Sequence, residues 1–251
     1  MRARRRFGQH FLHDPAVQRR IVEAIAPVPG ETIVEIGPGE GALTRPLIER
    51  AGRVAAIEID RDLAARLARE FPPERLALTV GSALEHDFGA LPAGTRLVGN
   101  LPYNISTPLL FHFARFADRL RDLHFMLQLE VVERMVAAPS TPQYGRLSVM
   151  LQCRFRMKRL FNVARGAFRP PPQVESAVVR LEPLAPGAFP RFDPSALEET
   201  VRRAFSARRK KLRNALPIGA ADYAALGIDP NLRPENLSPS DYVRIAQRLA
   251  G

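Results

Sequence analysis

Apolar positions along the chain alternate between two spacings, one typical of strands and one typical of helices. Short runs rich in branched and apolar residues predict strands over residues 32–36, 53–59, 76–80, 96–100 and 123–129. Apolar positions three or four residues apart predict helices over residues 15–27, 43–50, 61–70, 106–116, 131–137 and 144–155. Strands that alternate with helices are typical of a doubly wound, mostly parallel sheet, so the sequence predicts a Rossmann-like α/β domain.

The last quarter of the chain has a different pattern. Plausible strands over residues 158–163 and 177–181 are followed by a stretch rich in proline and glycine, from Pro183 to Pro190. Beyond it only helical patterns occur, over residues 194–206, 208–216, 221–226 and 238–249. We therefore predict an α/β domain over residues 1–185, which begins with a flexible basic arm at residues 1–12, and a small all-helical domain over residues 186–251.

The charge balance points to a polyanionic partner. The chain has 37 Lys and Arg against 26 Asp and Glu, a formal net charge of +11, which favours nucleic acid or an anionic membrane surface. The run Arg208, Arg209, Lys210 and Lys211 is either a solvated helix face or an RNA contact, and the overall charge favours RNA.

Cysteine and histidine usage limits the chemistry further. A single cysteine, Cys153, excludes an internal disulfide and fits a reducing cytoplasm; its apolar surroundings predict a buried core residue. The five histidines have no convincing metal-ligand spacing, so no metal is expected. No stretch has the length of a membrane span, and the basic N-terminus lacks the apolar segment of a signal peptide.

The segment Asn100-Leu101-Pro102-Tyr103 follows a predicted strand and is the strongest candidate for chemistry. The Asn100 amide oxygen and the Leu101 carbonyl are two acceptors that suit the two hydrogens of an exocyclic amino group, such as that of adenine. Pro102 restricts Leu101 to extended conformations, and Tyr103 offers a stacking face for a base taken out of its helix. The alternative is an ordinary turn, in which Asn and Pro are common.

A glycine-rich loop after the first predicted strand indicates a nucleoside cofactor. Gly37 and Gly39 let the backbone pass close to a ligand, and Glu58, at the end of the next strand, suits the ribose hydroxyls. The third glycine, Gly41, comes one position early for a dinucleotide fingerprint, and Glu40 in the loop would repel a pyrophosphate. The loop therefore favours S-adenosylmethionine, whose sulfonium and ammonium are cationic, over NAD.

These motifs together resemble the ribosomal RNA adenine dimethyltransferase family. The similarity covers nearly the whole chain and is carried by residues 7–12, 35–39, 58–60, 100–107, 144–149, 168–177 and 208–214. Within that family the chain is most similar to the bacterial enzymes that act on small-subunit (16S) rRNA. The resemblance implies N6,N6-dimethylation of two adjacent adenosines near the 3′ end of that RNA, with S-adenosylmethionine as the methyl donor.

The resemblance also implies roles for single residues. His10 and Leu12 are expected to fold over the cofactor, and Phe168 is expected to stack on the target base, although a core position is the alternative for Phe168. Ser82 stands where the family usually has an Asp that binds the cofactor's adenine, which predicts weaker cofactor binding. The helical domain, with residues 208–211, is expected to contact RNA or the subunit, and we expect a monomer.

Three other functions compete with this one. An enzyme of the same chemistry could act on large-subunit (23S) rRNA and confer macrolide resistance. A non-catalytic assembly or transcription factor could keep the fold for RNA binding, although the intact segment from Asn100 to Tyr103 argues against lost activity. An NAD oxidoreductase is disfavoured by the glycine spacing and by the absence of an acid or base suited to hydride transfer.

Overall fold

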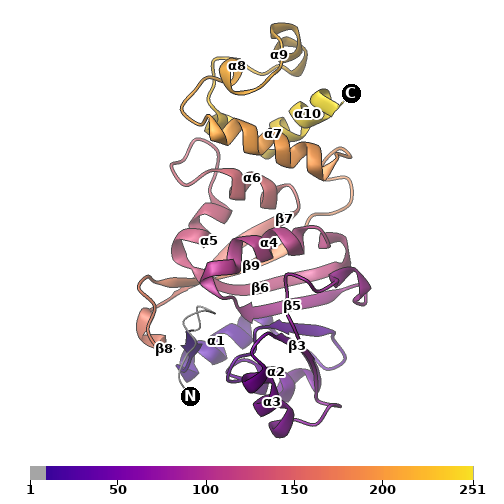
Figure 1. Ribbon diagram of the computed structural model, residues 1–251, viewed down its shortest axis with the longest axis vertical. Coiled ribbons are helices and arrows are strands. Elements are labelled where there is room, and N and C mark those ends of the chain that lie inside the picture. Colours follow the sequence, from indigo (N-terminus) through magenta and orange to yellow (C-terminus); the bar gives the residue numbers. More distant parts are fainter. Residues whose placement is uncertain (1–9, 251) are drawn as a thin grey trace. The chain divides into compact units, whose positions relative to one another are not determined.

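The computed structural model describes residues 10–250, which form two compact units (Figure 1). The first unit contains the chain up to Val132 and returns with Met157–Pro183; the second contains Glu133–Arg156 and the chain from Leu184 onward. Residues 1–9 of the predicted arm lie outside the described residues. In residues 10–250 no helix is both long and apolar enough to cross a membrane.

The first unit is built on a seven-stranded sheet. Its strands are β2 (Ile33–Ile36), β3 (Val54–Glu58), β4 (Leu76–Val80), β5 (Thr95–Asn100), β6 (Leu120–Gln128), β7 (Phe155–Val163) and β9 (Ser176–Pro183). The strand order is β4-β3-β2-β5-β6-β9-β7. The strands from β4 to β6 are parallel, whereas β9 pairs antiparallel to β6. The prediction of a mostly parallel α/β sheet is therefore confirmed.

Helices follow the strands in the order that the pattern predicted. They are α1 (Pro15–Ile25), α2 (Thr44–Ala51), α3 (Arg61–Glu70), α4 (Ser106–Ala114) and α5 (Leu129–Val136). Short 3-10 helices lie at Phe88–Ala90, Tyr103–Ile105, Ala117–Arg119 and Arg165–Ala167. Asp14 caps α1 by accepting from the backbone N–H groups of Ala16 and Val17, and Pro15 occupies the first turn, where no hydrogen-bond donor is lost.

The centre of the sheet is buried on both faces. All four residues of β2 are buried, and so are the first five residues of β5, as expected for parallel strands covered by helices on each side. The strand order changes direction between β2 and β5, because β3 lies on one side of β2 and β5 on the other. Ligands of open α/β sheets bind at the carboxyl ends of the strands near such a point.

A second, two-stranded sheet joins segments far apart in the sequence. β1 (Phe11–Leu12) pairs antiparallel with β8 (Phe168–Arg169), and the backbone N–H of His13 donates to the carbonyl of Ala167 at 2.9 Å. The sequence placed residues 11 and 12 in a flexible arm; that prediction is wrong for them, because strand pairing and the burial of Leu12, 5% exposed, hold the segment in place.

The second unit is a helical cluster. It contains α6 (Arg146–Gln152), α7 (Pro194–Ser206), α8 (Leu212–Ala215), α9 (Ala220–Leu226), α10 (Pro239–Ala250) and a 3-10 helix at Pro234–Asn236. Its core includes Cys153, as predicted, and Tyr144, whose hydroxyl donates to the Leu237 carbonyl at 2.9 Å. Burial raises the pKa of the Cys153 thiol to about 12.

The structure corrects two predicted boundaries. Residues 133–156, which the sequence placed in the first domain, belong to the second unit because α6 packs on α7 and α10. The predicted helix over residues 208–216 is helical only at Leu212–Ala215, and residues 207–209 form a turn.

Candidate active site

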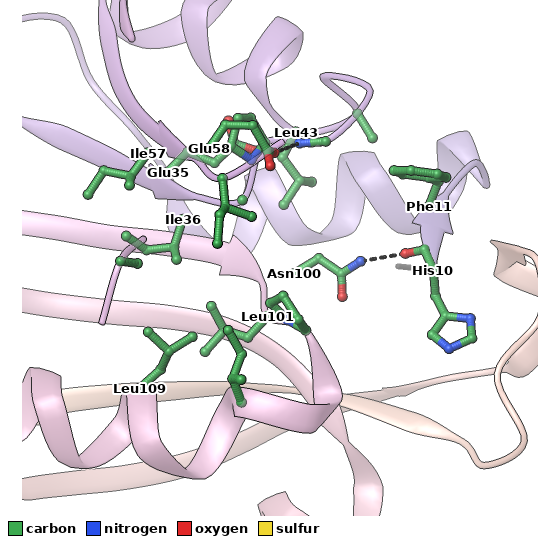
Figure 2. A pocket seen from close by; sticks show the side chains of 18 of the residues that line it. His10, Phe11, Glu35, Ile36, Leu43, Ile57, Glu58, Asn100, Leu101 and Leu109 are labelled. Carbon is green, nitrogen blue, oxygen red and sulfur yellow. Dashed lines mark hydrogen bonds between the residues drawn. The ribbon is translucent and has the colours of Figure 1, made fainter. Parts of the chain in front are cut away.

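A cavity of about 970 Å³, part of it open to solvent, lies in the first unit at the carboxyl ends of β2, β3 and β5 (Figure 2). Ten residues that the sequence singled out line it: His10, Leu12, Gly37, Gly39, Glu58, Ser82, Asn100, Leu101, Pro102 and Tyr103. Parallel strands end at the same edge of a sheet, so motifs far apart in the sequence meet here.

The Asn100 side chain is oriented by the N-terminal segment. Its amide Nδ2 donates to the main-chain carbonyl of His10 at 2.9 Å, and Figure 2 shows the amide oxygen turned away from that carbonyl. An amide whose nitrogen is engaged presents its oxygen as the free acceptor. Leu101 is anchored beside it, because its backbone N–H donates to the Met126 carbonyl at 3.2 Å on the neighbouring β6.

Tyr103 is held at both ends of its side chain. Its hydroxyl lies 2.5 Å from the Ser176 hydroxyl, and its ring stacks on the His10 imidazole with 5.3 Å between the centroids. The imidazole is itself fixed, because Nδ1 lies 2.8 Å from the Pro170 carbonyl and therefore donates to it. Burial raises the pKa of the Tyr103 hydroxyl, which keeps the ring neutral. The structure thus places a rigid aromatic surface at the cavity.

The Glu58 carboxylate closes the opposite wall of the cavity. It is 4% exposed, and its two oxygens accept the backbone N–H groups of Gly39 at 3.0 Å and Asp60 at 2.8 Å. Burial raises the pKa of Glu58 against the opposing effect of these hydrogen bonds. Each carboxylate oxygen keeps a further lone pair that can accept a hydroxyl hydrogen.

Gly39 shows why the loop needs a glycine. Its φ is +59°, and a Cβ added there would lie 3.3 Å from the ring of Phe11. A larger residue would therefore be strained and would push β1 away from the loop. Phe11 lies in the motif at residues 7–12 and lines the cavity, but the sequence analysis gave it no role of its own, because nothing local distinguishes it from a core aromatic.

Glu35 adds a second carboxyl group to the cavity wall. It is 2% exposed, and the Thr44 hydroxyl donates to it at 2.6 Å. Burial raises the pKa of Glu35 to about 7, and the nearby charge of Glu58 adds to the effect. Glu40 also lines the cavity, and three carboxyl groups together suit a ligand that carries both hydroxyl groups and positive charge.

Ser82 lies at the rim of the cavity, partly exposed, and its hydroxyl accepts the backbone N–H of Leu84 at 3.3 Å. The oxygen remains able to accept a further hydrogen bond, but it brings no charge. Aliphatic residues missed by the sequence analysis complete the lining, including Ile36, Leu43, Ile57, Ile59 and Leu109. Ile36 is the last residue of β2 and Ile57 precedes Glu58 at the end of β3, and this position beside motif residues is the one local signal that could have identified them.

Phe168 does not lie where the sequence-based resemblance placed it. Its side chain is 1% exposed, it is absent from the cavity lining, and it belongs to the apolar core beside Leu12 and Met126. In this conformation its ring cannot stack on a base, because the faces of the ring are covered by protein. Phe168 therefore occupies a core position, which was the alternative in the sequence analysis.

The basic run of the second unit lies in the turn between α7 and α8. Arg208 donates to the Pro142 carbonyl at 2.9 Å, and Lys211 Nζ lies 3.3 Å from the Asn231 side chain. Arg209 and Lys210 are exposed. The contact of these residues with RNA stays a prediction.

The chain is similar in sequence to known rRNA methyltransferases. A family model described as "Ribosomal RNA adenine dimethylase" matches residues 1–251. The "Ribosomal RNA small subunit methyltransferase A" of Aromatoleum aromaticum is 59% identical over 99% of this chain and 95% of its own, and that of Thiobacillus denitrificans is 58% identical over 98% of both.

Solved structures show the same fold. A dimethyladenosine transferase from Plasmodium falciparum has a TM-score of 0.80 at 23% identity and covers 96% of this chain and 98% of its own. The 23S rRNA methyltransferase ErmE has a TM-score of 0.69 at 27% identity and covers 96% of this chain and all of its own.

Proposed function

Because the chain belongs to the ribosomal RNA adenine dimethylase family, it is an rRNA methyltransferase, and we propose that it uses S-adenosylmethionine to dimethylate the N6 amino groups of two adjacent adenosines near the 3′ end of 16S rRNA. The observation that carries this proposal is the Asn100 side chain, whose nitrogen is engaged by the His10 carbonyl and whose oxygen is left as an acceptor at the cavity.

Two oxygens of the protein would hold the reacting amino group. The Asn100 amide oxygen and the Leu101 carbonyl each accept one N6 hydrogen of an adenine brought into the cavity. Adenine N6 is a poor nucleophile because its lone pair is delocalised into the ring. Two acceptors favour a more tetrahedral nitrogen with a localised lone pair, and a fixed geometry removes the entropy cost of alignment. The Tyr103 ring, fixed by Ser176 and His10, supports the base by stacking.

The opposite wall of the cavity fits the cofactor. Glu58 would accept the ribose hydroxyl hydrogens, and the backbone at Gly37 and Gly39 allows close approach of the methionine part. Burial raises the pKa values of Glu35 and Glu58, and a bound sulfonium and ammonium would favour their charged forms, because a nearby positive charge lowers the pKa of a carboxyl group. When bound, S-adenosylmethionine supplies an electrophilic methyl group. The aliphatic side chains of the lining offer water no hydrogen-bond partner.

The nitrogen needs no strong base. Once it carries an added methyl group it is cationic and its N–H hydrogens, two after the first transfer and one after the second, are acidic, so the Asn100 oxygen can accept a hydrogen bond from one of them until water removes the proton. A second methylation requires room for the first methyl group, and Pro102 and Leu101 offer an apolar wall.

We further propose that 16S rRNA within the small-subunit precursor is the substrate. The relatives named for the small subunit are 58–59% identical to this chain, whereas the 23S enzyme is 27% identical. A net charge of +11 favours RNA over a neutral partner. We propose that the protein acts as a monomer without a membrane partner, in the cytoplasm, whose reducing conditions fit its single cysteine.

Primer extension tests the proposal. Ribosomal subunits from a strain that lacks this gene are incubated with the protein and S-adenosylmethionine, and reverse transcription is run on both rRNAs. We expect stops at two adjacent adenosines near the 3′ end of the small-subunit RNA and none in the Asn100→Ala control. A stop in the large-subunit RNA would assign the alternative substrate, and no stop in either would overturn the proposal.

A further inference from the structure

Residues 11–20, which comprise β1 and the start of α1, run alongside residues 161–169, which comprise the end of β7 and the segment that follows it. Phe11 pairs with Arg169 in the small sheet, and the N–H of His13 donates to the carbonyl of Ala167. Further along, the Arg20 guanidinium lies 3.9 Å from the centroid of the Phe161 ring. Residue numbers rise along one segment as they fall along the other, so the two segments are antiparallel neighbours.

This pair of segments carries a concentration of positive charge. Residues 157–174 contain four cations and no carboxylate, and α1 adds two arginines against one glutamate, Glu23. We call the exposed cations the α1–β7 track: Arg19, Arg20, Lys158, Arg159, Arg165 and Arg169. Within residues 10–250, no ion pair joins a carboxylate to Arg19, Arg20 or Lys158. Their charge is therefore available to a partner.

Protection of the sheet edge explains only part of the track. β7 is the last strand in the order, and cations on an edge strand discourage pairing with another chain. That argument covers Lys158 and Arg159. It does not explain Arg19 and Arg20, which lie on a helix, nor Arg165 and Arg169, which lie beyond the end of β7.

One end of the track reaches the cavity. Arg169 is the strand partner of Phe11, which lines the cavity, and the carbonyl of Pro170 binds the His10 ring. An RNA strand that places one base in the cavity must continue past its rim, and its phosphates are spaced along that path. Arg20 is also pre-positioned, because its stacking on Phe161 restricts the side chain.

We propose that the α1–β7 track binds the phosphate groups of the rRNA strand that flanks the target adenosine. This inference rests on the proposed function, because it takes the RNA substrate as the partner. It assigns RNA binding to the first unit, next to the chemistry, in addition to the contact predicted for residues 208–211.

The test is the triple variant Arg19→Gln/Arg20→Gln/Lys158→Gln. The matched control removes three other exposed cations of the same unit, in Arg53→Gln/Arg69→Gln/Arg115→Gln. The probe is a fluorescein-labelled RNA with the 3′-terminal sequence of the small-subunit RNA, titrated by fluorescence anisotropy from 50 to 300 mM salt, with Kd for S-adenosylmethionine and Tm as fold controls. A third variant, Arg19→Lys/Arg20→Lys, keeps the charge.

The salt dependence of binding reports how many phosphates the protein neutralises. For single-stranded RNA, the slope of log K against log salt becomes shallower by about 0.7 for every phosphate that is no longer neutralised. We expect the triple variant to lose about two units of slope and between about 10-fold and 100-fold in affinity at 0.1 M salt. The cofactor Kd, the Tm and kcat at saturating RNA should not change, and the lysine variant should bind like the wild type.

Equal losses in the triple variant and the matched control would overturn the inference and leave the track as edge protection. If the wild-type protein binds RNA through the track but transfers no methyl group, the proposed function is wrong and the inference about the track still holds. A wild-type protein that binds no RNA would overturn both.

Discussion

Replacing Gly99 by alanine should lower both the stability of the sheet and the rate of methyl transfer. Gly99 lies in β5 with φ of +158°, and an added Cβ would lie 2.5 Å from the carbonyl oxygen of Ile36 in β2. Real Cβ atoms essentially never approach closer than 3.0 Å, so the backbone of β5 or of β2 must shift by at least 0.5 Å at this point. Gly99 precedes Asn100 and Ile36 precedes Gly37, so a shift of either strand displaces a wall of the cavity.

The magnitude follows from the size of this displacement. Forcing an extra carbon into a packed region costs about 1–3 kcal/mol, which lowers Tm by roughly 2–4 °C for each kcal/mol in a protein of this size. Misplacement of reacting groups by 1 Å can cost on the order of 100-fold in rate, so half that displacement predicts about a 10-fold loss in kcat.

The assay measures Tm by calorimetry, cofactor Kd by titration and kcat by transfer of labelled methyl groups to small subunits. The matched control is Gly166→Ala, because no atom lies within 4 Å of the Cβ it would add and its φ is not positive. We expect wild-type values for the control. If Gly99→Ala keeps the wild-type kcat at a temperature where it is folded, the argument that β2 and β5 position the reacting groups is wrong.

Three further changes test other parts of the structure. Burial raises the pKa of Glu35 to about 7, so the protonated form of this group favours folding. Its contribution to the stability of the fold is complete below pH 4.5 and is lost as pH rises through 7. Glu35→Gln should therefore show a smaller fall in Tm between pH 5 and pH 8 than the wild type. Arg96→Met leaves the buried carboxylate of Asp122, whose pKa is about 2, without the guanidinium 2.9 Å away. Urea unfolding should show that the free energy of unfolding falls by about 3–5 kcal/mol. The double variant Arg96→Met/Asp122→Leu should recover most of this loss, because it removes the unpaired carboxylate. Ser82→Asp should tighten the binding of S-adenosylmethionine in isothermal titration, because it adds a charged acceptor at the rim; equal or weaker binding would count against that role.

The elements that build the site could be predicted because their patterns are local. Alternation of strands and helices identified β2, β3 and β5, and the residue types at their ends identified Gly37, Glu58 and Asn100. Because parallel strands end at one edge of a sheet, these residues had to meet. The start of α1 was also predictable, since Asp14 and Pro15 form a helix-capping pair.

The rest depends on contacts between distant parts of the chain. His10 and Pro170 are 160 residues apart in the chain, and the two-residue strands β1 and β8 are too short to show any periodicity. Phe168 has the same local surroundings whether it faces the cavity or the core, and only the packing of β8 against Leu12 decides. Arg208 and Arg209 are good helix formers, yet the backbone turns there, with Lys210 N–H donating to the Ala207 carbonyl.

The most direct measurement of the central claim is mass spectrometry of nucleosides from small-subunit rRNA. Unmethylated subunits are incubated with S-adenosylmethionine and either the wild-type protein or Asn100→Ala, after both proteins have been shown to bind the cofactor. We predict N6,N6-dimethyladenosine with the wild type and its near absence with the variant. No gain of methyl mass with the wild type, or an equal gain with the variant, would contradict the claim that the Asn100 oxygen holds the reacting amine.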